Sequence, residues 1–307
     1  MKKSTIGNKY PLQLAELDNI CDFWKAKKDV QMKITVLVDN RASSVSHELQ
    51  TEHGLSFYIE YNNHKILCDM GATEAFADNA KTLGIDIAEC DFAFISHGHN
   101  DHCGGLGHFL ENVEEKRVYI HSDIPNEEYF STRRRTRRSL SCNHGVFNNY
   151  KERFHFLDTT TEITDGCFAV QCRTMAHSTP YGNCFLIKNN GEKDEKDSFE
   201  HELSLAFITT KGLVIISPCS HCGALNIIHE CQRITGCDKV HAYIGGLHFV
   251  EGETCIAEAN TFAEAVENVF PETLFITGHC TCDTAKEILT KSTDMLKTFS
   301  TGDVIEL

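Results

Sequence analysis

Residues 92–106 read Phe-Ala-Phe-Ile-Ser-His-Gly-His-Asn-Asp-His-Cys-Gly-Gly-Leu, which is the most specific signal in the sequence. An apolar, strand-like run ends in a loop that carries four potential metal ligands within six positions, namely His97, His99, Asp101 and His102. Imidazole and carboxylate groups are good ligands for zinc, iron and manganese. The alternative is a hydrophilic loop with chance histidines, but His-x-His-x-Asp-His directly after an apolar strand is a dense and specific pattern. We therefore predict a metal centre here.

The spacing of these ligands indicates two adjacent ions rather than one. Ligands two and three residues apart cannot all converge on one ion from a regular strand, and two ions need further protein donors. Three more histidines each follow an apolar, strand-like run, which is where the sites of layered α/β folds gather: His221, His248 and His279. We expect His221 and His279 to be ligands. His248 is either a ligand or a group that contacts the substrate.

The order of apolar runs predicts an α/β protein. Residues 55–61 and 64–69 flank the turn Asn62-Asn63, which indicates a hairpin. Further strands are expected over residues 33–40, 92–96, 168–172, 184–188, 203–209, 213–217, 241–244 and 273–276, and helices over residues 73–83, 224–235 and 257–269. Both halves of the chain contain strands followed by helices, and sheets covered by helices on their outer faces account for this order.

We accordingly predict an αββα sandwich over residues 32–307. Residues 1–31 carry apolar side chains at a helix-like period, so we expect an N-terminal helical extension there. The charged, glycine-containing residues 189–201 are typical of a surface loop.

Composition limits the class of protein. Hydrophobic residues make up 41% and charged residues 24% of the 307 positions, which is ordinary for a globular chain. The net charge of −15 disfavours nucleic acid and anionic membranes as partners. The N-terminus has no secretory pattern and no apolar run is long enough to span a membrane, so we expect a cytoplasmic protein. The odd number of 15 cysteines favours free thiols over a disulfide framework, with Cys68 and Cys184 packing as small hydrophobes.

The motifs together resemble the metallo-β-lactamase superfamily. Residues 95–106 look like its metal-binding signature, and residues 66–71 (Ile-Leu-Cys-Asp-Met-Gly) resemble its Asp-Thr-Gly strand end. Glu52-His53-Gly54-Leu55-Ser56, Cys219-Ser220-His221, Gly245-Gly246-Leu247-His248 and Gly278-His279-Cys280-Thr281 are similar to one branch, named after 7,8-dihydropterin-6-methyl-4-(β-D-ribofuranosyl)-aminobenzene-5′-phosphate synthase. The resemblance runs from about residue 35 to the C-terminus. Met70 and Cys103 depart from the threonines usual in the superfamily.

The resemblance implies the division of the ligands between two ions. His97, His99 and His221 would bind one metal, and Asp101, His102 and His279 the other. His177 lies where many superfamily members carry a metal histidine and is a rival to His221. The ions are two divalent metals, with Zn²⁺ expected first and Fe or Mn as alternatives.

Three further features have more than one interpretation. The segments Cys219–Cys222 and His279–Cys282 could hold a structural zinc, or their cysteines could pack beside the site, with Cys219 as a ligand at its edge. The run of residues 133–138 contains five arginines, and it is either a solvated face or a phosphate-binding loop in which Arg133 and Arg134 contact the substrate. His53 is either a substrate contact or a surface histidine.

These features predict a dinuclear metal-dependent hydrolase. Metal-activated hydroxide would attack an ester, lactone, phosphoester or amide. Asp101 would orient the water, and His248 would polarise a small-molecule substrate. The arginines would suit a substrate that is phosphorylated. A pterin-pathway phosphoribosyl transferase is the first alternative, as the branch name suggests. A non-enzymatic metal or redox sensor that uses the cysteines is the second. A homodimer is compatible with the sequence.

Overall fold

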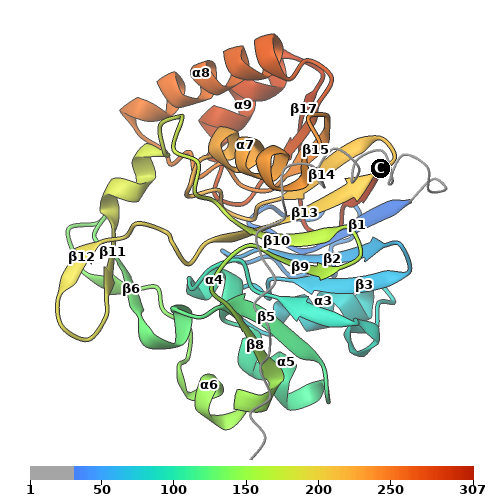
Figure 1. Ribbon diagram of the computed structural model, residues 1–307, viewed down its shortest axis with the longest axis vertical. Helices are drawn as coiled ribbons and strands as arrows, with labels where there is room; N and C mark the ends of the chain where they lie inside the picture. Colours follow the sequence, from blue (N-terminus) through green and yellow to red (C-terminus); the bar gives the residue numbers. More distant parts are fainter. Residues whose placement is uncertain (1–30) are drawn as a thin grey trace, which may run out of the picture.

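The computed structural model describes residues 31–307 and contains two large mixed sheets packed face to face (Figure 1). The first sheet has the order β18-β1-β2-β3-β4-β5-β8. Its strands, in that order, are Val304–Glu306, Met32–Val38, Ser56–Tyr61, His64–Cys68, Phe92–Phe94, Arg117–His121 and Phe154–Leu157. The predicted hairpin at Asn62-Asn63 is confirmed, because both asparagines have positive φ (48° and 66°) and join β2 to β3 as the tight turn requires.

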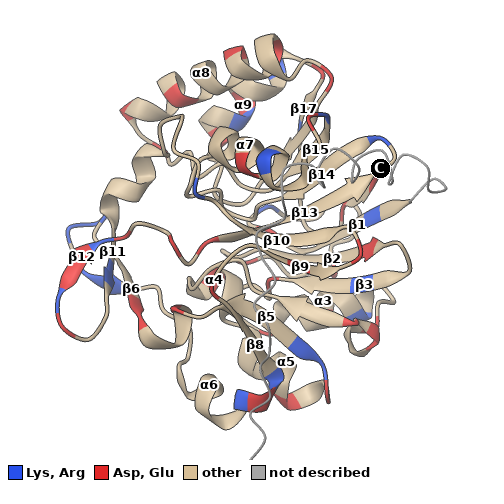
Figure 2. Cartoon of the chain, in the orientation of Figure 1, with Lys and Arg blue, Asp and Glu red and all other residues tan. Residues whose placement is uncertain are grey.

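The second sheet has the order β17-β16-β15-β14-β13-β10-β9. Its strands, in that order, are Leu296–Thr298, Leu274–Thr277, Val240–Ile244, Gly212–Ile216, Leu203–Thr209, Cys167–Gln171 and Thr161–Thr164. The central strands β13 and β14 contain only apolar and small polar residues and are buried throughout, and Figure 2 draws both strands in tan, the colour of uncharged residues. Strands of this kind are covered on both faces.

Helices cover the outer face of each sheet. They are α3 (Ala75–Thr82), α5 (Leu106–Asn112) and α6 (Gly145–Asn149) in the first half of the chain, and α7 (Ala224–Thr235), α8 (Glu253–Val269) and α9 (Asp283–Ser292) in the second. The short helix α4 (Asn100–Cys103) follows the end of β4. One apolar cluster joins the inner faces of both sheets, including Phe57, Phe207 and Ile244. Two others lie between each sheet and its own helices. This is the predicted αββα sandwich.

A small third sheet lies to one side of the sandwich. It has the order β12-β11-β6-β7, with strands Asp194–Lys196, Leu186–Asn189, Glu128–Ser131 and Arg138–Ser139. No helix of the described residues combines the length and the apolar character that a membrane span requires. The predicted helical segment within residues 1–31 lies outside the described residues, except for residue 31.

Several expected elements are wrong in detail. Residues 184–188 begin as a 3₁₀ turn (Tyr181–Phe185) rather than a strand, and the Cys184 side chain is exposed instead of packed. The segment 189–201 is not a plain surface loop, since it contains β12 and ends in Asp197, Phe199 and His201, which are buried. The buried residues follow a charged stretch, so the composition of the whole segment concealed them.

Candidate metal centre

The first ligand loop leaves the sandwich at the carboxyl end of β4. The chain continues through His97 and His99 and then turns into α4, which carries Asp101 and His102 on its first turn. The next residue after α4 is Gly104, and a Cβ there would collide with the Ala72 carbonyl oxygen. Glycine therefore lets α4 approach the loop that follows β3, and this approach brings His102 against Asp69.

His97, His99 and His221 form one cluster of imidazoles. Nε2 of His97 lies 3.1 Å from Nδ1 of His99, and the His221 ring centroid lies 4.9 Å and 5.1 Å from the two other rings. All three side chains are buried. Nε2 of His99 and Nε2 of His221 have no hydrogen-bond partner despite their burial. Buried polar atoms are normally paired, so these two nitrogens indicate a missing ligand.

The electrostatics of this cluster suit metal binding. Burial lowers the pKa of His99 to about 3 and holds the pKa values of His97 and His221 well below the ordinary value. Neighbouring imidazoles lower the pKa of His97 and His221 further, because each disfavours a charge on the others. The three rings are therefore neutral, which is the form that binds a metal.

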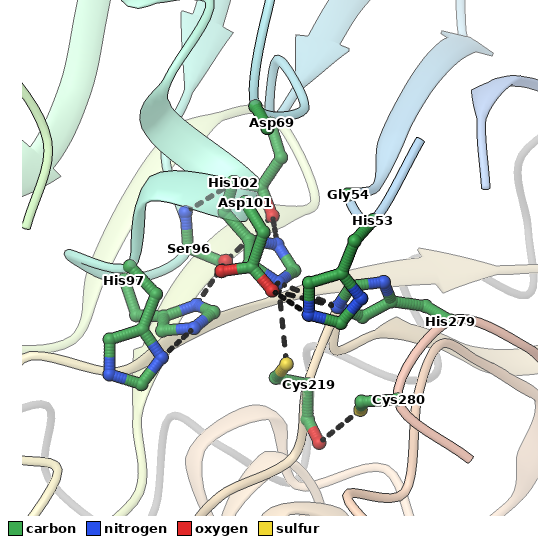
Figure 3. Close-up of polar contacts among 12 residues, drawn as sticks. His53, Gly54, Asp69, Ser96, His97, Asp101, His102, Cys219, His279 and Cys280 are labelled. Atoms are coloured by element: carbon green, nitrogen blue, oxygen red, sulfur yellow. Dashed lines mark hydrogen bonds and ion pairs between the residues drawn. The ribbon is translucent and has the colours of Figure 1, made fainter. Parts of the chain in front are cut away.

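Asp101, His102 and His279 form the second cluster (Figure 3). Nε2 of His102 lies 3.0 Å from Nε2 of His279, and Oδ2 of Asp101 lies 3.5 Å from Nε2 of His279 and 4.0 Å from Nε2 of His102. Burial by itself lowers the pKa of His279, but the contact with Asp101 outweighs it and raises the pKa to about 9. Metal binding at this cluster would therefore displace a proton from His279.

Cys219 lies between the two clusters. Its Sγ is 3.3 Å from Nε2 of His102 (Figure 3), and it lies within 4.8 Å of donor atoms of His97 and His221 on one side and of His102 and His279 on the other. Three of the four candidate ligand groups in residues 31–307 contain Cys219, and two of these three belong to the two clusters. A deprotonated thiol at this place could contact both ions. The sequence placed Cys219 at the edge of the site or among packing residues, whereas the structure places it at the centre.

Four of the five candidate ligand rings, those of His97, His102, His221 and His279, are held by a partner on Nδ1. Asp69 Oδ2 lies 2.7 Å from Nδ1 of His102. Nδ1 of His97, His221 and His279 lies 2.9–3.1 Å from Ser96 Oγ, Asn183 Oδ1 and Asn40 Oδ1, respectively. Such partners fix the tautomer and leave Nε2 free to bind, which is the usual environment of metal-ligating histidines. The residues present therefore fit a pair of metal ions.

His248 lines the pocket above the first cluster. Its ring centroid lies 4.2 Å from that of His221, and its Nδ1 is buried without a hydrogen-bond partner. His248 has a positive φ of 52°, a conformation that costs energy for a residue with a side chain. The position agrees with either role predicted for it, ligand or substrate contact. His248, Cys219 and Cys280 also form a candidate ligand group of their own.

The structure does not assemble the alternative structural zinc site. Cys222 lies near the Phe199 carbonyl oxygen, and Sγ of Cys282 lies 2.7 Å from Sγ of Cys255. Neither Cys222 nor Cys282 belongs to a candidate ligand group of the described residues.

The remaining candidates are divided between the pocket and the surface. His53 Nε2 lies 3.3 Å from Asp101 Oδ2 at the mouth of the pocket. Arg133 lines the same pocket, and Arg134 lines an adjoining hollow that also includes His53.

His177 lies elsewhere, with Nε2 3.3 Å from Nδ1 of His229, so His221 rather than His177 joins the first cluster.

Known proteins are similar to this chain in sequence and in fold. The family model described as the metallo-beta-lactamase superfamily matches residues 50–170. A solved structure described as a metal-dependent hydrolase of the beta-lactamase superfamily aligns with 90% of this chain and 99% of its own, at 25% identity and a TM-score of 0.74. The chain has the metallo-β-lactamase fold. A diphosphatase of the PhnP family shares that fold at 12% identity and a TM-score of 0.51, over 90% of this chain and 98% of its own.

One curated relative confirms the resemblance to the synthase branch. It is a 7,8-dihydropterin-6-methyl-4-(beta-D-ribofuranosyl)-aminobenzene-5′-phosphate synthase of Methanocaldococcus jannaschii. It is 27% identical over 262 residues, which cover 81% of this chain and 87% of the relative. The metallo-β-lactamase fold and this likeness indicate a metal-binding enzyme.

Proposed function

We propose that the protein is a dinuclear metal-dependent hydrolase. The observation that carries the proposal is the pair of ligand clusters joined by Cys219 at the base of one pocket. Two divalent ions, with zinc first by ligand type, would lower the pKa of a water molecule between them and polarise the bond to be broken.

The side chains of the chain have distinct parts in this proposal. His97, His99 and His221 would hold one ion, and Asp101, His102 and His279 the other. Asp101 has a second contact, with His53 at the pocket mouth, so it can orient a water molecule from the side that faces the solvent. His53 and His248 line the pocket on either side of the clusters, where each can donate a hydrogen bond to a bound substrate.

The proposal is tested by a screen for turnover. Protein of measured metal content is assayed on phosphoesters, lactones, thioesters and amides, beside a His221→Ala variant. We expect hydrolysis of at least one class by the native chain and its loss in the variant, because removal of His221 opens the first cluster. A fully metal-loaded chain that hydrolyses none of these classes would contradict the proposal.

A pterin-pathway phosphoribosyl transferase is the second candidate, and the name of the Methanocaldococcus jannaschii relative favours it. The arginines near the pocket would suit a phosphoribosyl group. Release of pyrophosphate from a mixture of dihydropterin and phosphoribosyl substrates, of which the phosphoribosyl substrate carries the diphosphate that leaves, would select this candidate over the hydrolase. We also propose that the substrate is a small molecule and that the protein acts in the cytoplasm.

A further inference from the structure

The hairpin formed by β6 and β7 (residues 128–139, here called the arginine hairpin) is joined directly to the first ligand loop. The carbonyl oxygen of Leu140, just after β7, accepts a hydrogen bond of 2.6 Å from the backbone N–H of Asn100. His99 and Ser141 form an isolated β-bridge. The chain that leaves the arginine hairpin therefore pairs with the segment that carries His99 and Asp101, and this pairing sets the hairpin over the metal centre.

Three arginines of this hairpin face the pocket or its extension. Arg133 and Arg138 line the pocket whose base contains His99, His221 and His279. Arg133 and Arg138 also line the adjoining hollow, together with Arg134, Thr136 and Ser131. His53 borders both spaces, so the two form one continuous surface that runs from the metal centre outward.

The charges of these arginines are not neutralised by carboxylates. Arg137 of the same hairpin forms an ion pair with Asp194 at 3.0 Å and stacks on Phe130. Arg134 and Arg138, in contrast, form no ion pair with any residue from 31 to 307, and the Arg133 guanidinium donates to the backbone carbonyl of Glu251.

The carboxylates of the pocket form no ion pair with these arginines. Glu251, whose carboxylate accepts a hydrogen bond from Thr284, and Asp101, which belongs to the ligand cluster, line the pocket, but neither lines the outer hollow. Figure 2 shows blue segments beside β6 and β11. Arg133, Arg134 and Arg138 thus form a local positive patch without carboxylate partners, although the net charge of the chain is −15.

We propose that Arg133, Arg134 and Arg138 form an anion subsite that binds a phosphate group of the substrate. This inference rests on the proposed function, because the phosphate belongs to the substrate of that reaction. Guanidinium groups donate paired hydrogen bonds to phosphate oxygens, and the hydroxyl groups of Ser131 and Thr136 can donate to the oxygens that remain. The phosphate lies in the outer hollow while the bond to be broken lies over the metal centre. The substrate is therefore a small phosphorylated molecule whose reacting group is separate from this phosphate.

Inorganic phosphate is the probe for this subsite, in calorimetric titration of the full chain as purified. The test variant is the double replacement Arg133→Gln/Arg138→Gln, and the control is Arg135→Gln on the same hairpin. Arg135 is exposed and lines neither space. We expect phosphate to bind the double variant about tenfold more weakly or worse, because two charge-assisted contacts are lost, and the control to stay within about twofold of the native chain. The single variant Arg134→Gln provides a second measurement if the double variant does not fold.

The variant His97→Ala distinguishes phosphate bound by the metals from phosphate bound by the arginines. The subsite predicts that this variant keeps arginine-dependent phosphate binding. Phenyl phosphate should compete with inorganic phosphate and phenol should not, since the subsite accepts a monoester. Three results would contradict the subsite. Phosphate binding could be unchanged by the arginine replacements, it could be lost in His97→Ala, or phenyl phosphate could fail to compete. The titration involves no turnover, so a chain that binds phosphate through these arginines yet hydrolyses nothing would count against the proposed function alone.

Discussion

Sγ of Cys219 lies 3.3 Å from Nε2 of His102, although 117 positions separate the two residues in the chain. Cys219 follows β14 of the second sheet and His102 lies in α4, after β4 of the first. The contact therefore joins the two halves of the sandwich at the metal centre. It also places one sulfur where both ions would be within reach.

Replacement of Cys219 by alanine should weaken metal binding at both clusters. The smaller side chain removes the donor that the two candidate groups share, whereas Cys219→Asp offers a carboxylate that can contact both ions and should restore part of the binding. The measurement is metal content after dialysis against a weak chelator. The matched control is Cys222→Ala, which removes a buried thiol outside the candidate groups and should leave metal content unchanged. Equal metal content in Cys219→Ala and Cys222→Ala would show that Cys219 is a packing residue.

Asp69 should affect metal binding without touching a metal. Its carboxylate faces Nδ1 of His102 and accepts hydrogen bonds from the backbone N–H and the hydroxyl of Ser96. An asparagine cannot accept from all these donors, so the His102 ring loses its fixed tautomer. We expect Asp69→Asn to lower metal affinity about 10- to 100-fold, measured by competition with a chromophoric chelator. Asp91→Asn, at a surface carboxylate that accepts from the Lys65 N–H, is the control and should bind metal normally.

Asp101→Asn should leave the fold intact and reduce turnover. The backbone carbonyl of Asp101 accepts from the Leu55 N–H, and this contact does not depend on the side chain. An amide oxygen can still approach the second ion, but it has no negative charge, so the ion binds more weakly and the water beside it is less acidic. The checks are thermal unfolding, metal content and the pH–rate profile on a substrate found in the screen. Full metal occupancy with an unchanged rate would mean that Asp101 is a bystander.

Acid should destabilise the protein partly through Glu230 on α7. Burial alone raises the pKa of Glu230, but hydrogen bonds from Arg233 and Thr174 outweigh it and hold the pKa below its ordinary value of 4.5. A carboxyl group with a lowered pKa in the folded state stabilises it fully above pH 4.5, and this contribution is lost as pH falls through the lower, folded-state pKa. Glu230→Gln should be less stable by about 1.5 kcal/mol near neutral pH, the low end for a hydrogen bond to a charged group.

The difference between Glu230→Gln and the native chain should shrink toward zero in acid, measured by urea unfolding across pH. A difference that stays constant with pH would contradict the role given to this carboxylate.

The sequence predicted those parts of the molecule that depend on local pattern. Strand β13 and helix α7 have the predicted bounds, because uninterrupted apolar runs and helical periodicity are local signals. Strands β6, β7 and β12 were missed, since they are short and carry charged residues. They exist through pairing within the third sheet, where β6 and β12 pair with β11 and β7 pairs with β6. Their stability comes from tertiary context, which no local pattern reports.

The same distinction applies to the metal centre. The candidate ligands His97, His99, Asp101 and His102 lie within six positions of the sequence, so their density alone suggested a site. The central position of Cys219 depends on how two sheets pack, and a Cys-Ser-His motif does not contain that information. The arginine run left two interpretations open, because the sequence does not tell which arginine meets Asp194 and which faces the pocket.

Metal-to-protein stoichiometry shows whether the sandwich holds two metal ions between its halves. Elemental analysis of the purified chain should give close to two divalent ions per protein molecule, and His97→Ala and His102→Ala should each lose at least one. His177→Ala, which removes an exposed histidine outside the clusters, should lose none. A native chain without bound metal, or metal content that is the same in the native chain and in both ligand variants, would contradict the account.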